Sequence, residues 1–325
     1  MIVDGHVHVC AMTPGHGKLS AKLRRRFSFV FMRWRLGVSF FADDERLERE
    51  VESKLVETVR QTPELDAAVV LAFDRVYGND GRADDANTHL YVTNEYVVEL
   101  VRKYPKLLFG ASIHPYRPDA LAELERCVAA GAVLMKWLPV TQDMNPADER
   151  CLPFYDALAH HGLPLLCHTG GELTLPYMNA GYADPELLVP ALKRGVTVIA
   201  AHCGTKALPF ETDYLPAFCR LAMDYEHFYG DTSALNLPLR SYAYKTILND
   251  EVVRRKLVHG SDWPVVTIPP ARMGRLKALR LLATEGNWMR RDVLIKQALG
   301  LDDDYWHRAA TLLRLPAAAD SSKSR

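Results

Sequence analysis

The chain has 325 residues, 48% of them hydrophobic, which is enough for a large core, yet no window reaches the ~18 uninterrupted apolar residues of a membrane span. Basic and acidic residues are balanced at 40 each, so the charge of the whole chain favours neither a nucleic-acid nor a membrane partner. The six cysteines form no C-x-x-C pair and no signal peptide precedes the first strand, so we expect reduced thiols in a cytoplasmic protein.

Residues 1–8, MIVDGHVH, are predicted to form a strand that carries two histidines at its end. Alternate residues of a strand point the same way, so Asp4, His6 and His8 are expected to share one face. Asp4 lies deeper and is interpreted as a buried supporting residue. Two imidazoles at i and i+2 of a strand can bind one divalent ion together, although this pair alone is weak evidence for a metal site.

A long insertion, residues 11–62, follows this strand. Its segment 18–41 mixes basic and aromatic residues, a composition also found on membrane and nucleic-acid surfaces. Because the whole chain is neutral, the sequence favours a helical insertion with a solvated basic face and an apolar underside. We expect residues 10–41 to form a lid or pocket wall and residues 43–61 to form a helix.

Beyond residue 62 the pattern alternates between short apolar runs and helical segments. Including the first strand, strands are predicted at 1–8, 67–73, 107–113, 132–140, 163–168, 196–202, 227–233 and 256–262. Helices are predicted at 86–104, 119–130, 148–161, 185–194, 214–224 and 242–249, and in the region 270–315. Eight such units predict the α/β class and a (β/α)8 TIM barrel, with a long insertion after strand 1 and extra C-terminal helices. We expect a single domain over residues 1–315 and a disordered tail at 316–325.

The predicted strands end in residues that bind metals: His6, His8, His168, His202 and Asp262. In a parallel barrel these ends meet at one mouth, where the catalytic residues of this fold lie. Imidazole nitrogens and a carboxylate oxygen suit zinc, iron or manganese. If His168 and His202 point inward, their neighbours Cys167 and Cys203 point outward into the helix layer.

Five ordered motifs carry a family resemblance: D-G-H-V-H at 4–8, L-L-C-H-T-G-G at 165–171, I-A-A-H-C-G at 199–204, G-D-T-S at 230–233 and H-G-S-D-W-P at 259–264. With them the chain resembles the amidohydrolase superfamily. Within it, the chain is most similar to the amidohydrolase-2 branch, which includes the aminocarboxymuconate-semialdehyde decarboxylase-like enzymes. The resemblance spans about residues 1–10 and 65–265.

The resemblance implies roles for the residues at the strand ends. His6, His8, His168 and Asp262 would bind a divalent metal ion, zinc before manganese or iron, and one ion is favoured over two. His202 would stand beside the metal as an acid, or would orient water and substrate. Asp262 would also accept the proton of the attacking water.

Four further residues are candidates for substrate binding. Lys136 is either a bridging metal ligand or a substrate contact, and a plain salt bridge in the barrel mouth is favoured over both. Glu172 follows a glycine pair and is more often solvated in such a loop. Arg240 is interpreted as a surface arginine that could instead hold a substrate carboxylate. Trp263 is expected to form an aromatic pocket wall, and Asp231 to hold nearby histidines or loop backbone in place.

The leading functional hypothesis is a metal-dependent hydrolase, in which activated water attacks an amide, lactone or ester-like bond of a small molecule. The alternative is a metal-dependent, non-oxidative decarboxylase of an aromatic or semialdehyde carboxylic acid. A catalytically silent binding barrel is a third possibility, but it predicts broken ligand positions, and all five are present. We expect no nucleic-acid or membrane partner. The sequence does not decide the oligomeric state, so a homodimer stays open.

Overall fold

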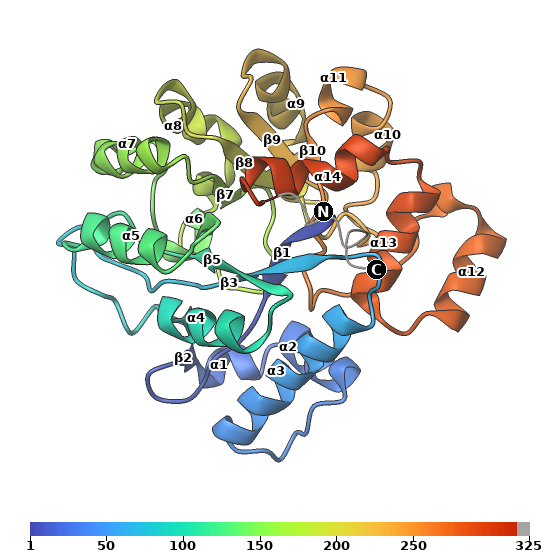
Figure 1. Cartoon of the computed structure of the whole chain (residues 1–325), viewed down its shortest axis with the longest axis horizontal. Helices are drawn as coiled ribbons and strands as arrows, with labels where there is room; N and C mark the ends of the chain where they lie inside the picture. Colours follow the sequence, from blue (N-terminus) through green and yellow to red (C-terminus); the bar gives the residue numbers. More distant parts are fainter. Residues whose placement is uncertain (317–325) are drawn as a thin grey trace, which may run out of the picture.

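The computed structural model describes residues 1–316, and its core is one parallel sheet of eight strands that is surrounded by helices (Figure 1). Neighbouring strands of the sheet follow one another in chain order. The strands are β1 (Val3–His8), β3 (Ala67–Leu71), β5 (Leu107–Ala111), β6 (Leu134–Trp137), β7 (Leu165–His168), β8 (Val198–Ala201), β9 (Phe228–Asp231) and β10 (Leu257–Val258). The predicted (β/α)8 fold is therefore confirmed. Apart from Pro316, the tail predicted to be disordered lies outside the described residues.

Helices cover the outside of the sheet, as predicted for buried parallel strands. They are α1 (Ala21–Arg24), α2 (Phe27–Leu36), α3 (Asp44–Arg60), α4 (Asn94–Lys103), α5 (Ala120–Ala129), α6 (Pro139–Gln142), α7 (Leu152–His161), α8 (Val189–Lys193), α9 (Leu215–Asp224), α10 (Ala243–Ile247), α11 (Glu251–Arg254), α12 (Arg275–Thr284), α13 (Trp288–Ala298) and α14 (Asp303–Leu312). The last three are the predicted extra C-terminal helices. Ala309 and Leu313, at the end of α14, pack against the side chains that fill the barrel interior, so α14 plugs the barrel (Figure 1).

The barrel closes between β1 and the segment after β10. Gly5 N donates to His259 O at 3.0 Å, Asp262 N donates to His6 O at 2.9 Å, and His8 N donates to Trp263 O at 2.8 Å. The predicted last strand, 256–262, is shorter than expected, because β10 covers only Leu257–Val258 and Asp262 lies beyond its end. These backbone bonds hold Asp262 beside His6.

A register shift in β1 corrects one expectation. Between Asp4 and Val7, β1 has one residue more than the paired segment of β3, so β1 contains a bulge. Val3 packs in the inner cluster and Val7 in the outer one, so the alternation of faces changes at this bulge. Asp4 therefore does not share the face of His6. Its Oδ1 instead accepts from Ser261 N at 2.9 Å, which agrees with the predicted supporting role.

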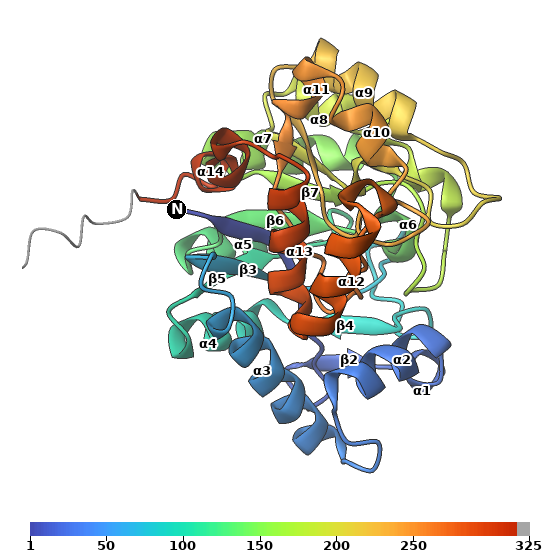
Figure 2. The same cartoon turned by 90° about the vertical axis from the view of Figure 1, so that its right-hand side faces the viewer.

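The insertion contains a small sheet that the sequence did not predict. β2 (Gly17–Leu19) pairs antiparallel with β4 (Leu90–Val92). The helix predicted at 86–104 therefore begins only at Asn94, where the Thr93 side chain caps it by accepting from Tyr96 N. Figure 2 shows the insertion at the end of the barrel opposite the N-terminus.

Helix α2 has the expected apolar underside, where Phe29 and Leu36 pack against the core, but this underside is only partly buried. The helix has no fully buried residue, and the side chains of Phe27 and Trp34 are 83% and 60% exposed. The helix α3, predicted at 43–61, is confirmed, and it buries Leu47, Val51 and Leu55 as its four-residue spacing required.

Glu48 of α3 holds the first residues of the insertion in place through hydrogen bonds. Its buried carboxylate accepts from Met12 N at 2.6 Å and from Thr13 N at 3.0 Å, and His16 Nδ1 lies 2.5 Å away. Burial alone would raise the pKa of Glu48, but these bonds outweigh it and lower the pKa below its usual 4.5.

We expect Glu48→Ala to lower the free energy of unfolding by about 2–4 kcal/mol, because it leaves two buried backbone donors unpaired. The exposed Glu45→Ala on the same helix should cost less than about 1 kcal/mol. Denaturant titration measures both, and equal losses would contradict this role. Because the folded pKa is depressed, the contribution is present above pH 4.5 and is lost as the pH falls through the folded value.

The six cysteines are all free thiols, as predicted. Cys167 and Cys203 pack in the outer cluster with helix residues, which confirms their predicted orientation. Within residues 1–316, none of the helices combines the length and apolar character needed to cross a bilayer.

Candidate metal centre

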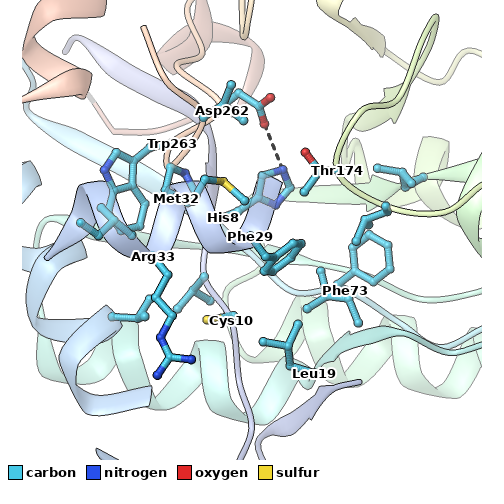
Figure 3. A pocket seen from close by; sticks show the side chains of 18 of the residues that line it. His8, Cys10, Leu19, Phe29, Met32, Arg33, Phe73, Thr174, Asp262 and Trp263 are labelled. Atoms are coloured by element: carbon cyan, nitrogen blue, oxygen red, sulfur yellow. Dashed lines mark ion pairs between the residues drawn. The ribbon is translucent and has the colours of Figure 1, made fainter. Parts of the chain in front are cut away.

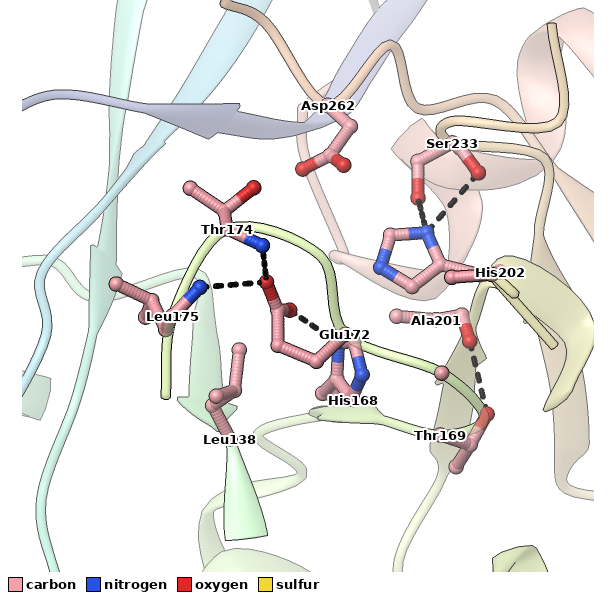
Figure 4. Close-up of polar contacts among 12 residues, drawn as sticks. Leu138, His168, Thr169, Glu172, Thr174, Leu175, Ala201, His202, Ser233 and Asp262 are labelled. Carbon is pink, nitrogen blue, oxygen red and sulfur yellow. Dashed lines mark hydrogen bonds and ion pairs between the residues drawn. The ribbon is translucent and has the colours of Figure 1, made fainter. Parts of the chain in front are cut away.

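The five predicted strand-end residues line one cavity at the mouth of the barrel, and Figure 4 shows His168, His202 and Asp262 among them. His6 Nε2 lies 3.1 Å from His8 Nε2 and 3.4 Å from Asp262 Oδ1, and His8 Nε2 lies 3.2 Å from the same oxygen. The ring centroids of His168 and His202 are 5.0 Å apart, and those of His6 and His202 are 5.3 Å apart. All five predicted residues therefore lie around one point.

One ligand atom each of His6, His202 and Asp262 lies within 4.8 Å of the other two. The resemblance placed His202 beside the ion, whereas this geometry groups it with two of the predicted ligands. Its orientation depends on the backbone. Ala201 faces the barrel interior, so strict alternation would turn His202 toward the helices. A left-handed φ of 60° at His202 turns its imidazole into the mouth instead.

Left-handed backbone is concentrated at this mouth. Among the described residues, the non-glycine positions with positive φ are Asp143, His202, Cys203, Ala234, Asp262 and Arg314. Three of them directly follow β8 and β9, and Asp262 has a φ of 63°. Such backbone costs about 1–3 kcal/mol per residue and is typical of functional sites.

Hydrogen bonds fix which nitrogen of two histidines faces the centre. His6 Nδ1 lies 2.7 Å from Asp231 Oδ2, and His202 Nδ1 lies 3.0 Å from the backbone oxygen of Ser233. Because a carboxylate and a carbonyl only accept, each Nδ1 carries the hydrogen and each Nε2 presents a lone pair, which in His6 also faces the Lys136 ammonium at 3.2 Å. Metal-binding histidines characteristically make such a bond with their second nitrogen. Asp231 takes the supporting place predicted for it.

Burial favours the neutral form of three of the histidines. It lowers the pKa of His6, His168 and His202 well below the usual value, and nearby positive groups lower it further. Burial alone would raise the pKa of Asp262, but the surrounding His6, His8 and Lys136 together lower it below its usual value.

These groups fit a divalent cation. His168 Nε2 is buried and has no hydrogen-bond partner among the described residues. Lone pairs of His6 and His8 and an oxygen of Asp262 also face one another at contact distance, which is unfavourable unless a cation or proton lies between them. Neutral imidazoles with one carboxylate are a usual ligand set for zinc, manganese or iron.

Lys136 and Glu172 both lie in the mouth, and both depart from the favoured expectation. Lys136 is fully buried with Nζ 3.2 Å from His6 Nε2, and within the described chain it forms no salt bridge. The side chain of Glu172 is only 10% exposed, so it is not solvated as its loop suggested. Its Oε1 accepts from Leu175 N at 2.9 Å and Oε2 lies 3.7 Å from His168 Nδ1 (Figure 4). Burial raises the pKa of Glu172.

Arg240 is not the surface arginine that the sequence favoured. It is 3% exposed, and its guanidinium donates to Thr205 Oγ1 at 3.0 Å and to the backbone oxygen of Gly171. It thereby joins the loops that follow His168 and His202, and its Nε has no partner among the described residues. Trp263 is buried and lines the cavity beside the centre, as predicted.

The sequence analysis missed two groups that support the centre. Ser233 Oγ lies 2.8 Å from His202 Nδ1 and 3.1 Å from His6 Nδ1, and the G-D-T-S motif was the available signal. Lys296 of α13 donates to Gly260 O at 2.8 Å and pairs with the buried Asp292. Lys296 thus supports the turn before Asp262, and its position in a poorly patterned helix gave no signal.

Two cavities meet at the centre. The first, about 140 Å³, has mainly apolar walls that include Phe29, Phe73 and Trp263 (Figure 3). The second, about 420 Å³, is bounded partly by Phe31 and Arg240. Both are lined by Met32, Glu172, Thr174, His202, Asp262 and Val265. Helix α2 forms a wall of both, so the predicted pocket wall in the insertion is confirmed.

A (β/α)8 barrel with histidines and an aspartate gathered at the carboxyl ends of its strands has the arrangement that is typical of barrel enzymes. The family model Amidohydro_2, described as amidohydrolase, matches residues 3–294. The chain therefore belongs to this family, as the motifs indicated.

Solved structures share the fold at low identity. An uncharacterised TIM-barrel protein of Bordetella bronchiseptica is 15% identical, with a TM-score of 0.65 over 96% of this chain and 98% of the other. A probable 2-pyrone-4,6-dicarboxylic acid hydrolase of Acinetobacter baumannii is 14% identical, with a TM-score of 0.55 over 96% and 99%. A 2,6-dihydroxybenzoate decarboxylase of Rhizobium is 14% identical, with a TM-score of 0.55 over 97% and 99%. No curated protein matches the chain.

Proposed function

We propose that the chain is a metal-dependent hydrolase that cleaves an amide, lactone or ester-like bond of a small, largely apolar molecule. The observation that carries this proposal is the convergence of imidazole lone pairs and one ionised carboxylate beside an apolar cavity. Membership of the amidohydrolase family supports the same class of reaction.

His6, His8, His168 and Asp262 would hold the ion. When bound, a divalent ion supplies a Lewis acid for the substrate oxygen and lowers the pKa of water toward neutrality. We favour one ion over two, and zinc before manganese or iron. The amine of Lys136 lies 3.2 Å from His6 Nε2, where it would repel a second cation.

Asp262 and His202 would carry the proton transfers. The ionised carboxylate of Asp262 would accept a proton from the attacking water, and it lines both cavities. His202 presents its unprotonated Nε2 to the same space, so it would orient the water or pass a proton toward the leaving group.

The substrate would occupy the apolar cavity with its reactive bond toward Asp262. Trp263 would pack against it, and Glu172 would face it from the loop after β7. Arg240 borders the second cavity, where its unpartnered Nε would favour a polar or anionic substituent. Lys136 would contact the substrate oxygen from the barrel interior.

The decarboxylase alternative is favoured by the volume and the aromatic lining of the first cavity. An apolar cavity of about 150 Å³ holds one benzene ring in a well-studied protein. The first cavity is about 140 Å³ and has three aromatic walls, which suits an aromatic acid. A protein with the same fold is named as a decarboxylase of such an acid.

One experiment separates the two reactions. Metal-loaded protein is incubated with a panel of lactones and a panel of hydroxybenzoates, and ring opening and carbon dioxide release are measured. The hydrolase proposal predicts lactone opening. Carbon dioxide release with no lactone opening would overturn it in favour of the decarboxylase.

The apolar wall supplied by α2 can be tested separately. We expect Phe29→Ala to raise KM about tenfold with little change in kcat, because it removes apolar contact from bound substrate. Metal content should stay unchanged. Val30→Ala is the matched control, since Val30 lies next to Phe29 but lines neither cavity. Equal KM values for the two variants would contradict substrate binding in this cavity.

A further inference from the structure

Helix α2 presents apolar side chains on two opposite faces. On the inner face Phe29, Met32 and Leu36 line the first cavity (Figure 3). On the outer face Phe27, Phe31 and Trp34 form a row, with successive ring centroids 6.1 and 6.0 Å apart. Phe27 and Phe31 also border the second cavity, whereas the side chains of Phe27 and Trp34 are 83% and 60% exposed. Large aromatic side chains this exposed are unusual on a soluble protein and mark an interaction surface.

The segment that carries this row is also strongly basic, although Arg24 and Arg33 lie along the first cavity. Residues 18–36 contain seven basic residues and no acidic one: Lys18, Lys22, Arg24, Arg25, Arg26, Arg33 and Arg35. Arg24 pairs with Asp44. Within residues 1–316, Lys22, Arg25, Arg26 and Arg35 form no ion pair. The zero net charge of the chain therefore conceals a local excess of positive charge around the aromatic row.

We propose that the outer face of α2 docks on the surface of an anionic lipid bilayer. A basic helix with exposed Trp and Phe is typical of segments that lie in the membrane interface. Aromatic rings settle at the level of the headgroups, and each nearby arginine is attracted to anionic lipid. Both features coincide on this helix.

The charge of the face argues against a second copy of the chain as its partner. A two-fold contact places the same patch on both subunits, so the patch with Arg25, Arg26 and Arg35 would face an equally basic patch. Like charges in contact destabilise such an interface, whereas anionic lipid neutralises them.

The position of α2 connects docking to the cavity. Because the opposite face of the same helix lines the first cavity, a docked molecule holds that cavity next to the lipid. If the proposed function is correct, on which this step rests, an apolar substrate enters from the bilayer.

Trp34 provides a direct probe of docking. It is 60% exposed, and the other four tryptophans are buried: Trp137, Trp263, Trp288 and Trp306. We expect vesicles of phosphatidylcholine mixed with phosphatidylserine to shift the emission to shorter wavelength, and brominated lipid to quench it. Phosphatidylcholine alone should have a much smaller effect, and added salt should reverse the binding. No shift at low salt would overturn the proposal.

Flotation with the same vesicles tests the residues. The pair Arg25→Gln and Arg35→Gln should lower the partition coefficient about thirtyfold, and the pair Phe27→Ser and Trp34→Ser about tenfold or more. Leu121→Ser is the control, because Leu121 is 46% exposed on α5, away from the insertion. Undiminished binding of both pairs would overturn the assignment to α2.

Two other results would also overturn it. One is a dimer in sedimentation that the Phe27→Ser and Trp34→Ser pair dissociates, which would make the face a subunit contact. The other is tighter binding to single-stranded nucleic acid than to vesicles at equal salt. Binding is measured without metal or substrate, so it can succeed while the proposed reaction fails, or the reverse.

Discussion

Asp262→Asn is expected to lose the bound ion and to lower kcat/KM by about a thousandfold or more. The substitution keeps the shape of the side chain but removes the single carboxylate that lies 3.2 Å from His8 Nε2 and 3.4 Å from His6 Nε2. It also removes the group proposed to accept a proton from water. Metal analysis and steady-state kinetics on the same preparation measure both losses.

Asp143→Asn is a matched control, since Asp143 also has a left-handed φ and lies outside both cavities. Its metal content and turnover should be those of the unmodified protein. His168→Ala should reproduce the metal loss without removing the proposed base. Full metal occupancy in Asp262→Asn would exclude that residue from the ligand set.

His202→Ala is expected to retain the ion and to lower kcat by about 10²–10⁴-fold. This follows if His202 orients water or moves a proton and the other four residues hold the ion. The test distinguishes two real possibilities, because an atom of His202 lies within 4.8 Å of ligand atoms of His6 and Asp262 and could itself bind the ion.

His227→Ala is the control for this prediction, because His227 is an exposed histidine just before β9, at the opposite end of the barrel. It should change neither metal content nor kcat. A metal-free His202→Ala protein, with His227→Ala still loaded, would show that His202 is a ligand and would refute the division of roles.

The barrel and the gathering of its strand ends were predictable because both depend on local patterns. Apolar runs that alternate with helices define the fold, and its geometry brings the ends of the strands that carry His6 and His168 together, with Asp262 just beyond the end of β10. The same alternation along the strand predicts that Lys136 points inward, because it lies two residues after the inward-facing Leu134.

Features that depend on contacts distant in sequence were not predictable. The bulge in β1 reverses the face of Asp4, and only pairing with β3 reveals it. The short β4 forms because β2 lies beside it, so a helical pattern there was misleading. Arg240 is buried because two loops fold over it, and nothing in its own neighbourhood in the sequence shows this.

The insertion shows why the net charge of a whole chain is a poor guide to a local surface. The zero net charge of the chain favoured an insertion helix with a solvated basic face and an apolar underside. In the fold, α2 lies over the mouth with the expected apolar face toward the first cavity, and it carries a second apolar face on which Phe27 and Trp34 are 83% and 60% exposed.

Metal content is the most direct test of the central claim that this barrel mouth is a metal-dependent catalytic site. Protein purified after growth with adequate zinc, manganese and iron should contain about one ion per chain. Chelation should abolish activity, and adding back the metal should restore it. Less than about 0.2 ion per chain, with no activity gained on adding any of the three metals, would contradict the account.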